Sequence, residues 1–304
     1  MIYHLFELLS DYDIPGQRLM GYLSFRAMLA FVTAMLISFF AGRRIIRWLQ
    51  KKQIGETIRD LGLEGQMQKK GTPTMGGVII LLAILVSALL FCDLTNIYTQ
   101  LLIFTTVWCG GIGFADDYIK VFKHDKEGMS ERGKLILQVI LGCIVGLTVC
   151  FNNDIVIREK VRIEADADST HYLPQGSENV DVDSETIVSQ SGWKMENIIK
   201  STKTTLPFIK AHEFDYKWLS PFSGKWGWYC KWAIYVIMIV IVITACSNGT
   251  NLTDGMDGLA AGTSAIVGIV LGILAWLSGN LINSNYLDIM YIPGTGEMTV
   301  FMSI

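Results

Sequence analysis

The sequence has few charged residues, and this scarcity limits the kinds of protein that it can encode. Only 17% of the 304 residues are charged, whereas 51% are hydrophobic, and the mean hydropathy is +0.39. A soluble domain can seldom bury so large an apolar share. The composition therefore excludes an ordinary soluble fold and predicts a membrane protein.

Patterns for metal binding, disulfides and nucleic acid are also missing. The six cysteines lie in or beside apolar runs without a C-x-x-C pair, and the four histidines are scattered. This spacing predicts buried thiols and no zinc site. The net charge of −3 comes with basic residues clustered in loops, so no nucleic-acid partner is expected. The first residues lack the pattern of a removable signal peptide, so the first span is expected to stay in the membrane.

Six apolar stretches approach the length of about 20 residues that a membrane helix needs. A seventh begins near Met298 and reaches only to Ile304. The sequence thus predicts an all-α polytopic membrane protein with about six complete transmembrane helices and a truncated seventh. The six stretches are residues 22–42, 76–95, 97–115, 135–151, 231–247 and 259–279.

Lysine and arginine residues predict which connections face the cytoplasm. The connections at 42–72 and 116–134 are basic, whereas those around 92–96 and 280–297 contain neither lysine nor arginine. Short basic connections stay on the cytoplasmic side of a membrane. Counting the spans places the connection 247–258 on that side too. Three polar, glycine-containing stretches are therefore expected to face the cytoplasm.

Residues 152–229 form a long polar segment between two spans. Its acidic stretches and the alternating sequence IVIREKVRI, at 155–163, predict an extracytoplasmic insertion that is partly β. The chain is accordingly expected to divide into three parts. Residues 1–151 hold four helices and two cytoplasmic loops, residues 152–229 are the insertion, and residues 230–304 hold two helices, the polar loop and the truncated helix.

The first candidate site is FADDYIK, residues 114–120, where an apolar run meets two aspartates. Asp116 and Asp117 point about 100° apart on a helix, yet both can reach a polar cavity at its end. Carboxylate oxygens beside phosphate are what magnesium prefers. Lys120, one turn away, can neutralise the pair or meet a phosphate. The alternative interpretation is a solvated helix end with an ordinary ion pair.

The second candidate is QKKGTPTMGG, residues 68–77, which opens the second span. Lys69 and Lys70 precede a helix start in which Thr72 can cap and Pro73 suits the first turn. A helix N-terminus beside lysines is typical of phosphate sites. A capped helix next to ordinary basic residues would give the same pattern.

The third candidate is SNGTNLTDGMDGLAAG, residues 247–262. Side chains such as Asn251, Asp254 and Asp257 can bind a uracil edge or ribose hydroxyls, and the helix that follows favours anions at its start. A simple capped turn would need fewer polar residues. Two glycosylation sequons also occur here, but the predicted cytoplasmic position excludes their use. Together, the three stretches predict a site where a soluble phosphate donor meets a lipid acceptor.

These stretches resemble the successive motifs of the phospho-N-acetylmuramoyl-pentapeptide transferases (translocase I), within the polyprenyl-phosphate N-acetylhexosamine-1-phosphate transferase superfamily. The likeness rests on KKGTPTMGG, FADDYIK, GMSERGK and NLTDGMDGLAAG and covers nearly all of the chain except 152–229. It implies a magnesium-dependent, multi-pass enzyme of the bacterial inner membrane with its active site facing the cytoplasm. The implied reaction transfers phospho-MurNAc-pentapeptide from UDP-MurNAc-pentapeptide to undecaprenyl phosphate, giving lipid I and UMP in peptidoglycan synthesis.

The resemblance also implies roles for single residues. Asp116 and Asp117 would be the catalytic pair and candidate magnesium ligands, and Asn251, Asp254 and Asp257 would recognise the uridine. The residues expected to bind substrate are Lys69, Lys70, Thr74, Lys120, Lys134, Asn251, Asp254 and Asp257. The family's main magnesium ligand and its histidine cluster would lie beyond Ile304, so the sequence is expected to be an inactive N-terminal portion. The resemblance further suggests a homodimer in the lipid bilayer.

Other functions share some of these features. A GlcNAc-1-phosphate transferase would have the same aspartate pair, but GTPTMGG and NLTDG favour the muramoyl branch. A transporter or lipid-binding protein would place charges midway along its spans, whereas the acids here gather at one side. A binding or scaffolding module would bind UDP-sugar without turnover.

Overall fold

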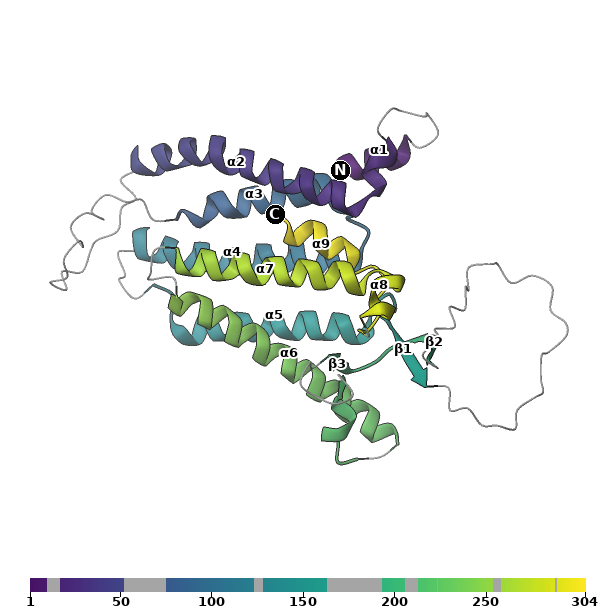
Figure 1. Ribbon diagram of the computed structural model, residues 1–304. Helices are drawn as coiled ribbons and strands as arrows, with labels where there is room; N and C mark the ends of the chain where they lie inside the picture. The colour runs from purple at the N-terminus through teal and green to yellow at the C-terminus, as the bar shows by residue number, and fades with distance from the viewer. Residues whose placement is uncertain are drawn as a thin grey trace, which may run out of the picture.

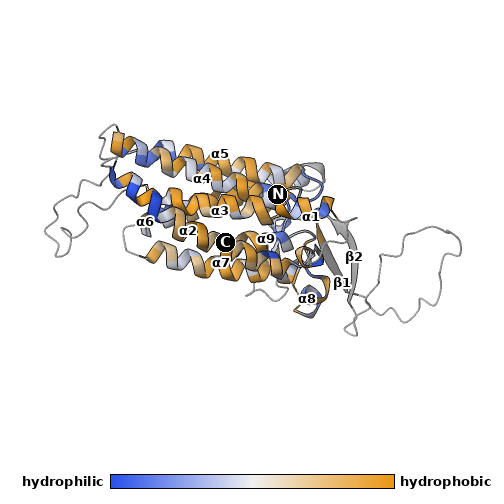
Figure 2. Ribbon diagram, turned by 90° about the horizontal axis from the view of Figure 1, so that it is seen from above, coloured by the Kyte–Doolittle hydropathy of each residue, from blue (hydrophilic) through white to orange (hydrophobic). Residues whose placement is uncertain are grey.

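The computed structural model describes residues 1–9, 17–51, 75–122, 128–162, 193–205, 213–222, 224–253, 258–287 and 289–304. In these ranges the chain forms a bundle of long helices, with small two-stranded sheets at one end (Figure 1). Figure 2 shows apolar residues along most of the helix lengths and hydrophilic residues towards the two ends. Such a distribution suits a bundle surrounded by lipid.

Six apolar helices build the bundle, and in the described ranges five of them are long and apolar enough to cross a membrane. The prediction of an all-α polytopic membrane protein is confirmed. The exception is α3, which has 15 residues because the backbone becomes extended at Cys92. It is shorter than the stretch predicted at 76–95. The six are α2 (Leu23–Lys51), α3 (Gly77–Phe91), α4 (Ile97–Phe122), α5 (Glu131–Phe151), α6 (Lys225–Thr253) and α7 (Leu259–Ser278).

Three helices continue past the C-terminal ends of the apolar stretches that predicted them. The α2 helix continues to Lys51, α4 to Phe122 and α6 to Thr253. Hydropathy falls where a helix leaves the lipid, but backbone hydrogen bonds do not require apolar side chains, so the polar turns stay helical. The aspartate pair and Asn251 consequently lie on helices, whereas Asn251 was expected in a loop.

The bundle has two distinct ends. The C-terminal ends of α2, α4 and α6 and the N-terminal ends of α3, α5 and α7 share one end of the bundle, called here the Asp116 end, in agreement with the predicted parity (Figure 1). The strands lie towards the other end, called the sheet end. The strand β1 (Ile157–Arg162) pairs antiparallel with β2 (Trp193–Ile199), and β3 (Lys203–Thr205) pairs antiparallel with β4 (Glu213–Asp215).

Short helices complete the fold. The helices α1 and α8 lie near the sheet end, and α9 packs inside the bundle against α7 and α2. Just inside the sheet end, α2, α3 and α9 share a buried apolar cluster of Ala30, Ala88, Phe91, Cys92, Val300 and Phe301. The short helices are α1 (Ile2–Leu8), α8 (Leu281–Tyr286), α9 (Gly296–Met302) and two 3-10 turns, η2 (Gln17–Gly21) and η4 (Tyr216–Leu219).

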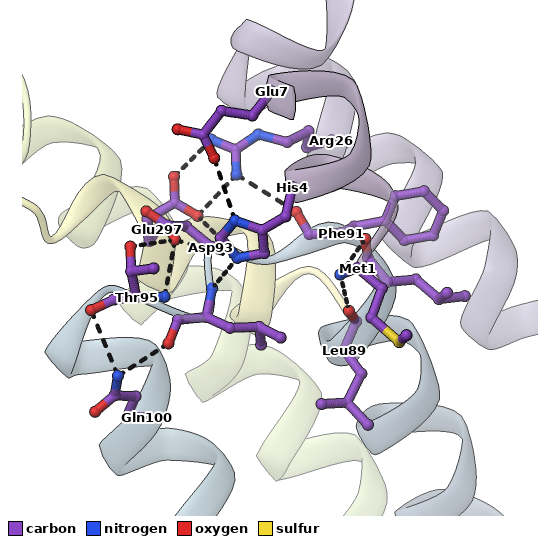
Figure 3. A network of polar contacts seen from close by, with 12 residues as sticks. Met1, His4, Glu7, Arg26, Leu89, Phe91, Asp93, Thr95, Gln100 and Glu297 are labelled. Carbon is purple, nitrogen blue, oxygen red and sulfur yellow. Dashed lines mark hydrogen bonds and ion pairs between the residues drawn. The ribbon is translucent and has the colours of Figure 1, made fainter. Parts of the chain in front are cut away.

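A buried ion pair ties the sheet end together. Arg26, on α2, is 3% exposed and donates hydrogen bonds to both carboxylate oxygens of Glu297, on α9, at 2.5 and 2.8 Å. The same carboxylate accepts from the backbone N–H of Asp93, and His4 accepts from the N–H of Leu94 (Figure 3). Elements from both ends of the sequence are thereby joined through hydrogen bonds.

Small residues bring α5 and α6 into close contact. A Cβ atom on Gly142 would lie 2.8 Å from the Cα of Val240, and one on Gly146 would lie 2.9 Å from Cγ1 of Val236. Glycines four residues apart share one helix face and let two backbones approach closely. This contact places the start of α5 beside the end of α6, where the candidate site lies.

Candidate active site

Asp116 lies at the centre of a compact polar site. The residue is 7% exposed, and its carboxylate accepts hydrogen bonds from three donors. The Lys120 ammonium lies 2.8 Å from Oδ2, the Lys134 ammonium lies 2.9 Å from Oδ1, and the N–H of Met129 donates to Oδ1 at 2.8 Å. A buried carboxylate requires such compensation, and charged donors provide the strongest hydrogen bonds.

The α4–α5 connection brings these groups together. Lys120 follows Asp116 by four residues on α4, so the two lie on one helix face. Ser130 caps α5, because its hydroxyl accepts a hydrogen bond from the N–H of Gly133 at 3.3 Å. The cap starts α5 directly opposite the polar turn of α4. Lys134, in the first turn of α5, therefore reaches the carboxylate.

Gly128 makes room for the Asp116 carboxylate. Its φ angle is +72°, which side-chain-bearing residues seldom adopt. A Cβ atom at this position would lie 2.5 Å from Oδ1 of Asp116 and 2.7 Å from Cε of Lys120. The sequence patterns did not predict a role for Gly128. The available signal was a glycine two residues before a helix-capping serine, within the stretch GMSERGK.

A second polar contact joins α5 to α6 one turn further along. Gln138 is 4% exposed and donates hydrogen bonds to Ser247 at 2.9 Å and to Asn248 at 3.2 Å. Asn248 donates back to Gln138 at 3.2 Å. Gln138 follows Lys134 by four residues, and Asn251 follows Asn248 by three, so each pair lies on one face of its helix. The contact thus sets the position of Asn251 relative to Lys134.

The two aspartates have different surroundings. The Asp116 oxygens accept from two ammonium groups, which would repel a divalent cation at the same atoms. Asp117 is half-buried and points about 100° away from Asp116. Magnesium commonly uses one or two protein carboxylates together with phosphate oxygens and water. The prediction that both aspartates bind magnesium stays a prediction.

Among the residues that the structure describes, no three His, Cys, Asp or Glu side chains gather into a metal site. Several predicted site residues lie outside the described ranges, namely Lys69, Lys70, Thr74, Asp254 and Asp257. Their described neighbours lie at the Asp116 end. Met75 forms a buried cluster with Leu49, and Val121 of α4 packs against it. Met75, which follows the lysine-containing stretch in the sequence, therefore lies next to the last turn of α4.

Comparison with known proteins finds relatives along the whole chain. Residues 194–296 match Glycosyl transferase family 4, and residues 69–81 match phospho-N-acetylmuramoyl-pentapeptide-transferase signature 1. A curated protein of Parabacteroides distasonis, named phospho-N-acetylmuramoyl-pentapeptide-transferase, is 48% identical over 99% of this chain and 67% of its own length. Proteins of the same name from Azobacteroides pseudotrichonymphae and Flavobacterium psychrophilum are also 48% identical. These alignments cover 100% of this chain and 68% and 70% of the relatives.

Proposed function

The chain belongs to the phospho-N-acetylmuramoyl-pentapeptide-transferase family, and from this premise we propose that it transfers phospho-MurNAc-pentapeptide from UDP-MurNAc-pentapeptide to undecaprenyl phosphate. The products are lipid I and UMP. The observation that carries the proposal is the 48% identity with a relative of that name over 99% of the chain. The ammonium groups of Lys120 and Lys134, beside the Asp116 carboxylate, supply positive charge that suits phosphates.

The reaction exchanges one pyrophosphate linkage for another. An oxygen of the lipid phosphate attacks the donor phosphorus that carries the sugar. The bond from this phosphorus to the UMP oxygen breaks, and its electron pair leaves with UMP. Because similar bonds form and break, the free energy of the reaction is close to zero. Catalysis comes from positioning and charge neutralisation. Direct attack requires no covalent enzyme intermediate.

We assign different tasks to the two members of the aspartate pair. Asp116 holds Lys120 and Lys134 in place, and their ammonium groups provide positive charge where the phosphates meet. Asp117 is the proposed magnesium ligand, and the bound ion would neutralise phosphate charge. The substrate-binding roles predicted for Lys69, Lys70, Thr74, Asn251, Asp254 and Asp257 complete the proposed site.

We place the Asp116 end in the cytoplasm, at the inner membrane of a bacterium. Arg43, Arg44, Arg47 and Lys51 lie on the part of α2 nearest to this end, and short basic segments stay on the cytoplasmic side. A charged, soluble donor and a membrane-bound acceptor would meet at that boundary. The homodimer suggested by the resemblance stays a prediction.

UMP release tests the proposal. The full-length protein in detergent receives undecaprenyl phosphate and magnesium, with UDP-MurNAc-pentapeptide or UDP-GlcNAc offered in parallel, and Asp117→Asn serves as the variant. We expect release only with the muramoyl donor, and its loss in the variant and on magnesium chelation. Release from UDP-GlcNAc alone would identify a GlcNAc-1-phosphate transferase instead. No release from either donor would reject the enzyme function, and a trapped aspartyl-phosphate would reject direct attack.

A further inference from the structure

The outer face of α2 carries a stripe in which apolar residues give way to arginines. Residues three or four positions apart share one side of a helix. The apolar members of the stripe are 40% to 64% exposed, and the arginines after them are exposed as well. The α2 stripe consists of Val32, Leu36, Phe39, Phe40, Arg43, Arg44 and Arg47.

The basic part of the α2 stripe forms an open hollow of about 420 Å³, which all three arginines and the two phenylalanines line. The Arg43 guanidinium lies 4.3 Å from the ring centre of Phe39, and Arg47 donates from Nε to the Arg43 carbonyl at 3.1 Å. Within the described part of the chain, no carboxylate forms an ion pair with any of the three. The lining of the hollow consists of three guanidinium groups and two aromatic rings, so it carries positive charge.

We propose that the α2 stripe binds a phospholipid whose head group carries a net negative charge. The lipid phosphate would occupy the hollow, where guanidinium groups can bind it through two parallel hydrogen bonds. An acyl chain would follow Phe40, Leu36 and Val32 along the helix. Basic residues next to a membrane span attract anionic lipids. The order of arginines, phenylalanines and aliphatic residues along α2 matches the order of head group, interface and chain in a lipid.

The acceptor lipid of the proposed reaction fits this surface less well, because its phosphate must reach the Asp116 site. The opposite face of α2 is the one that packs into the bundle. Gly42 lies against Ile79 of α3, and buried Leu49 lies near Val121 of α4. The hollow therefore faces away from the helix that carries the aspartates.

A second copy of the chain also fits less well. In a membrane dimer with its two-fold axis along the membrane normal, identical residues meet at the same depth. A dimer formed through the α2 stripe would bring arginines of one copy against arginines of the other. Like charges at close range repel each other, so an anion is the better occupant.

Lipid retention by the whole protein tests this inference. The protein is exchanged into detergent with equal amounts of phosphatidylglycerol and phosphatidylcholine, and native mass spectrometry counts the bound lipids. The test variant is Arg43→Gln/Arg47→Gln. The matched control, Arg18→Gln/Lys217→Gln, removes two exposed charges at the sheet end. We expect preferential binding of phosphatidylglycerol, reduced about 30-fold in the test variant, from roughly 1 kcal/mol per charge, and unchanged in the control.

Three results would overturn the inference. One is equal retention of the two lipids, or an equal loss in both variants. Another is displacement of phosphatidylglycerol from the hollow by undecaprenyl phosphate, which would make the hollow an acceptor site. The third is a dimer that dissociates in the test variant while lipid retention stays the same. The assay does not measure UMP release, so its failure is distinguishable from failure of the proposed function.

Discussion

The ammonium group of Lys134, on α5, lies 2.9 Å from Oδ1 of Asp116, on α4. The Lys134 side chain is 20% exposed, so water screens this ion pair only in part. The contact holds the first turn of α5 against the polar turn of α4. It makes the two residues one functional unit, whose parts come from different helices.

Replacing Lys134 is therefore expected to reduce catalysis. Lys134→Gln removes a charged donor that contributes about 1.5–3 kcal/mol, so UMP release should fall by about 10- to 100-fold. Arg132→Gln removes a nearby, exposed charge and should leave the rate nearly unchanged. Initial rates at saturating substrate compare the variants. Equal rates for both would contradict the assigned role of Lys134.

Adding a methyl group at Gly128 should disturb the same site. In Gly128→Ala the new Cβ would lie 2.5 Å from Oδ1 of Asp116, at a φ angle that costs alanine about 1–2 kcal/mol. We expect at least about a tenfold loss of UMP release, by analogy with removal of a charged hydrogen bond. The matched control is Gly113→Ala on α4, where nothing lies within 4 Å of the added atom. A Gly128→Ala protein as active as the control would show that the carboxylate can move freely.

The polar contact between α5 and α6 should be measurable as a coupling energy. Gln138→Leu and Asn248→Leu each remove the reciprocal hydrogen bonds. A double-mutant cycle on unfolding in detergent is expected to give about 0.5–1.5 kcal/mol, as for other hydrogen bonds between membrane helices. Val139→Ala, at an exposed position next to Gln138, should show no coupling with Asn248→Leu. A coupling energy near zero for the first pair would indicate that α5 and α6 are held by packing alone.

The ion pair at the sheet end should matter for stability more than for catalysis. Glu297→Gln would leave Arg26 buried without a counter-charge, which typically costs about 3–5 kcal/mol. Thermal unfolding in detergent should show a large fall in melting temperature. The control Glu7→Gln changes a carboxylate that is 62% exposed and should have little effect. Similar melting temperatures for the two variants would exclude a structural role for the pair.

Sequence patterns predicted the outline of the fold well, because apolar runs mark the membrane-spanning helices and basic connections indicate their orientation. They also predicted that Asp116, Lys134 and Asn251 would face the cytoplasm together. In the structure the three residues lie at one end of the bundle, and the side of the membrane that this end faces stays a prediction. They could not predict how the aspartates differ. That difference arises from Lys134 and Met129, which reach Asp116 only after α5 packs against α4.

The Arg26–Glu297 pair was missed for a related reason. Its two members are 271 residues apart, and no local pattern links them. A signal was nevertheless present, because an arginine within an apolar span is costly and implies a partner. Gln138 gave the same kind of signal within the stretch 135–151. Single polar residues inside apolar runs thus indicate tertiary contacts that the lengths of the runs do not.

The backbone contact at Gly142 and Gly146 has a mechanical consequence. Two helices in such close contact resist sliding and separation, so α5 and α6 are expected to move as one rigid unit. In this unit α5 carries Lys134 and α6 carries Asn251. A tilt of the two helices would shift both residues together and keep the distance between them constant. The packing of α5 on α6 therefore fixes the distance between the proposed phosphate-binding and uridine-binding groups.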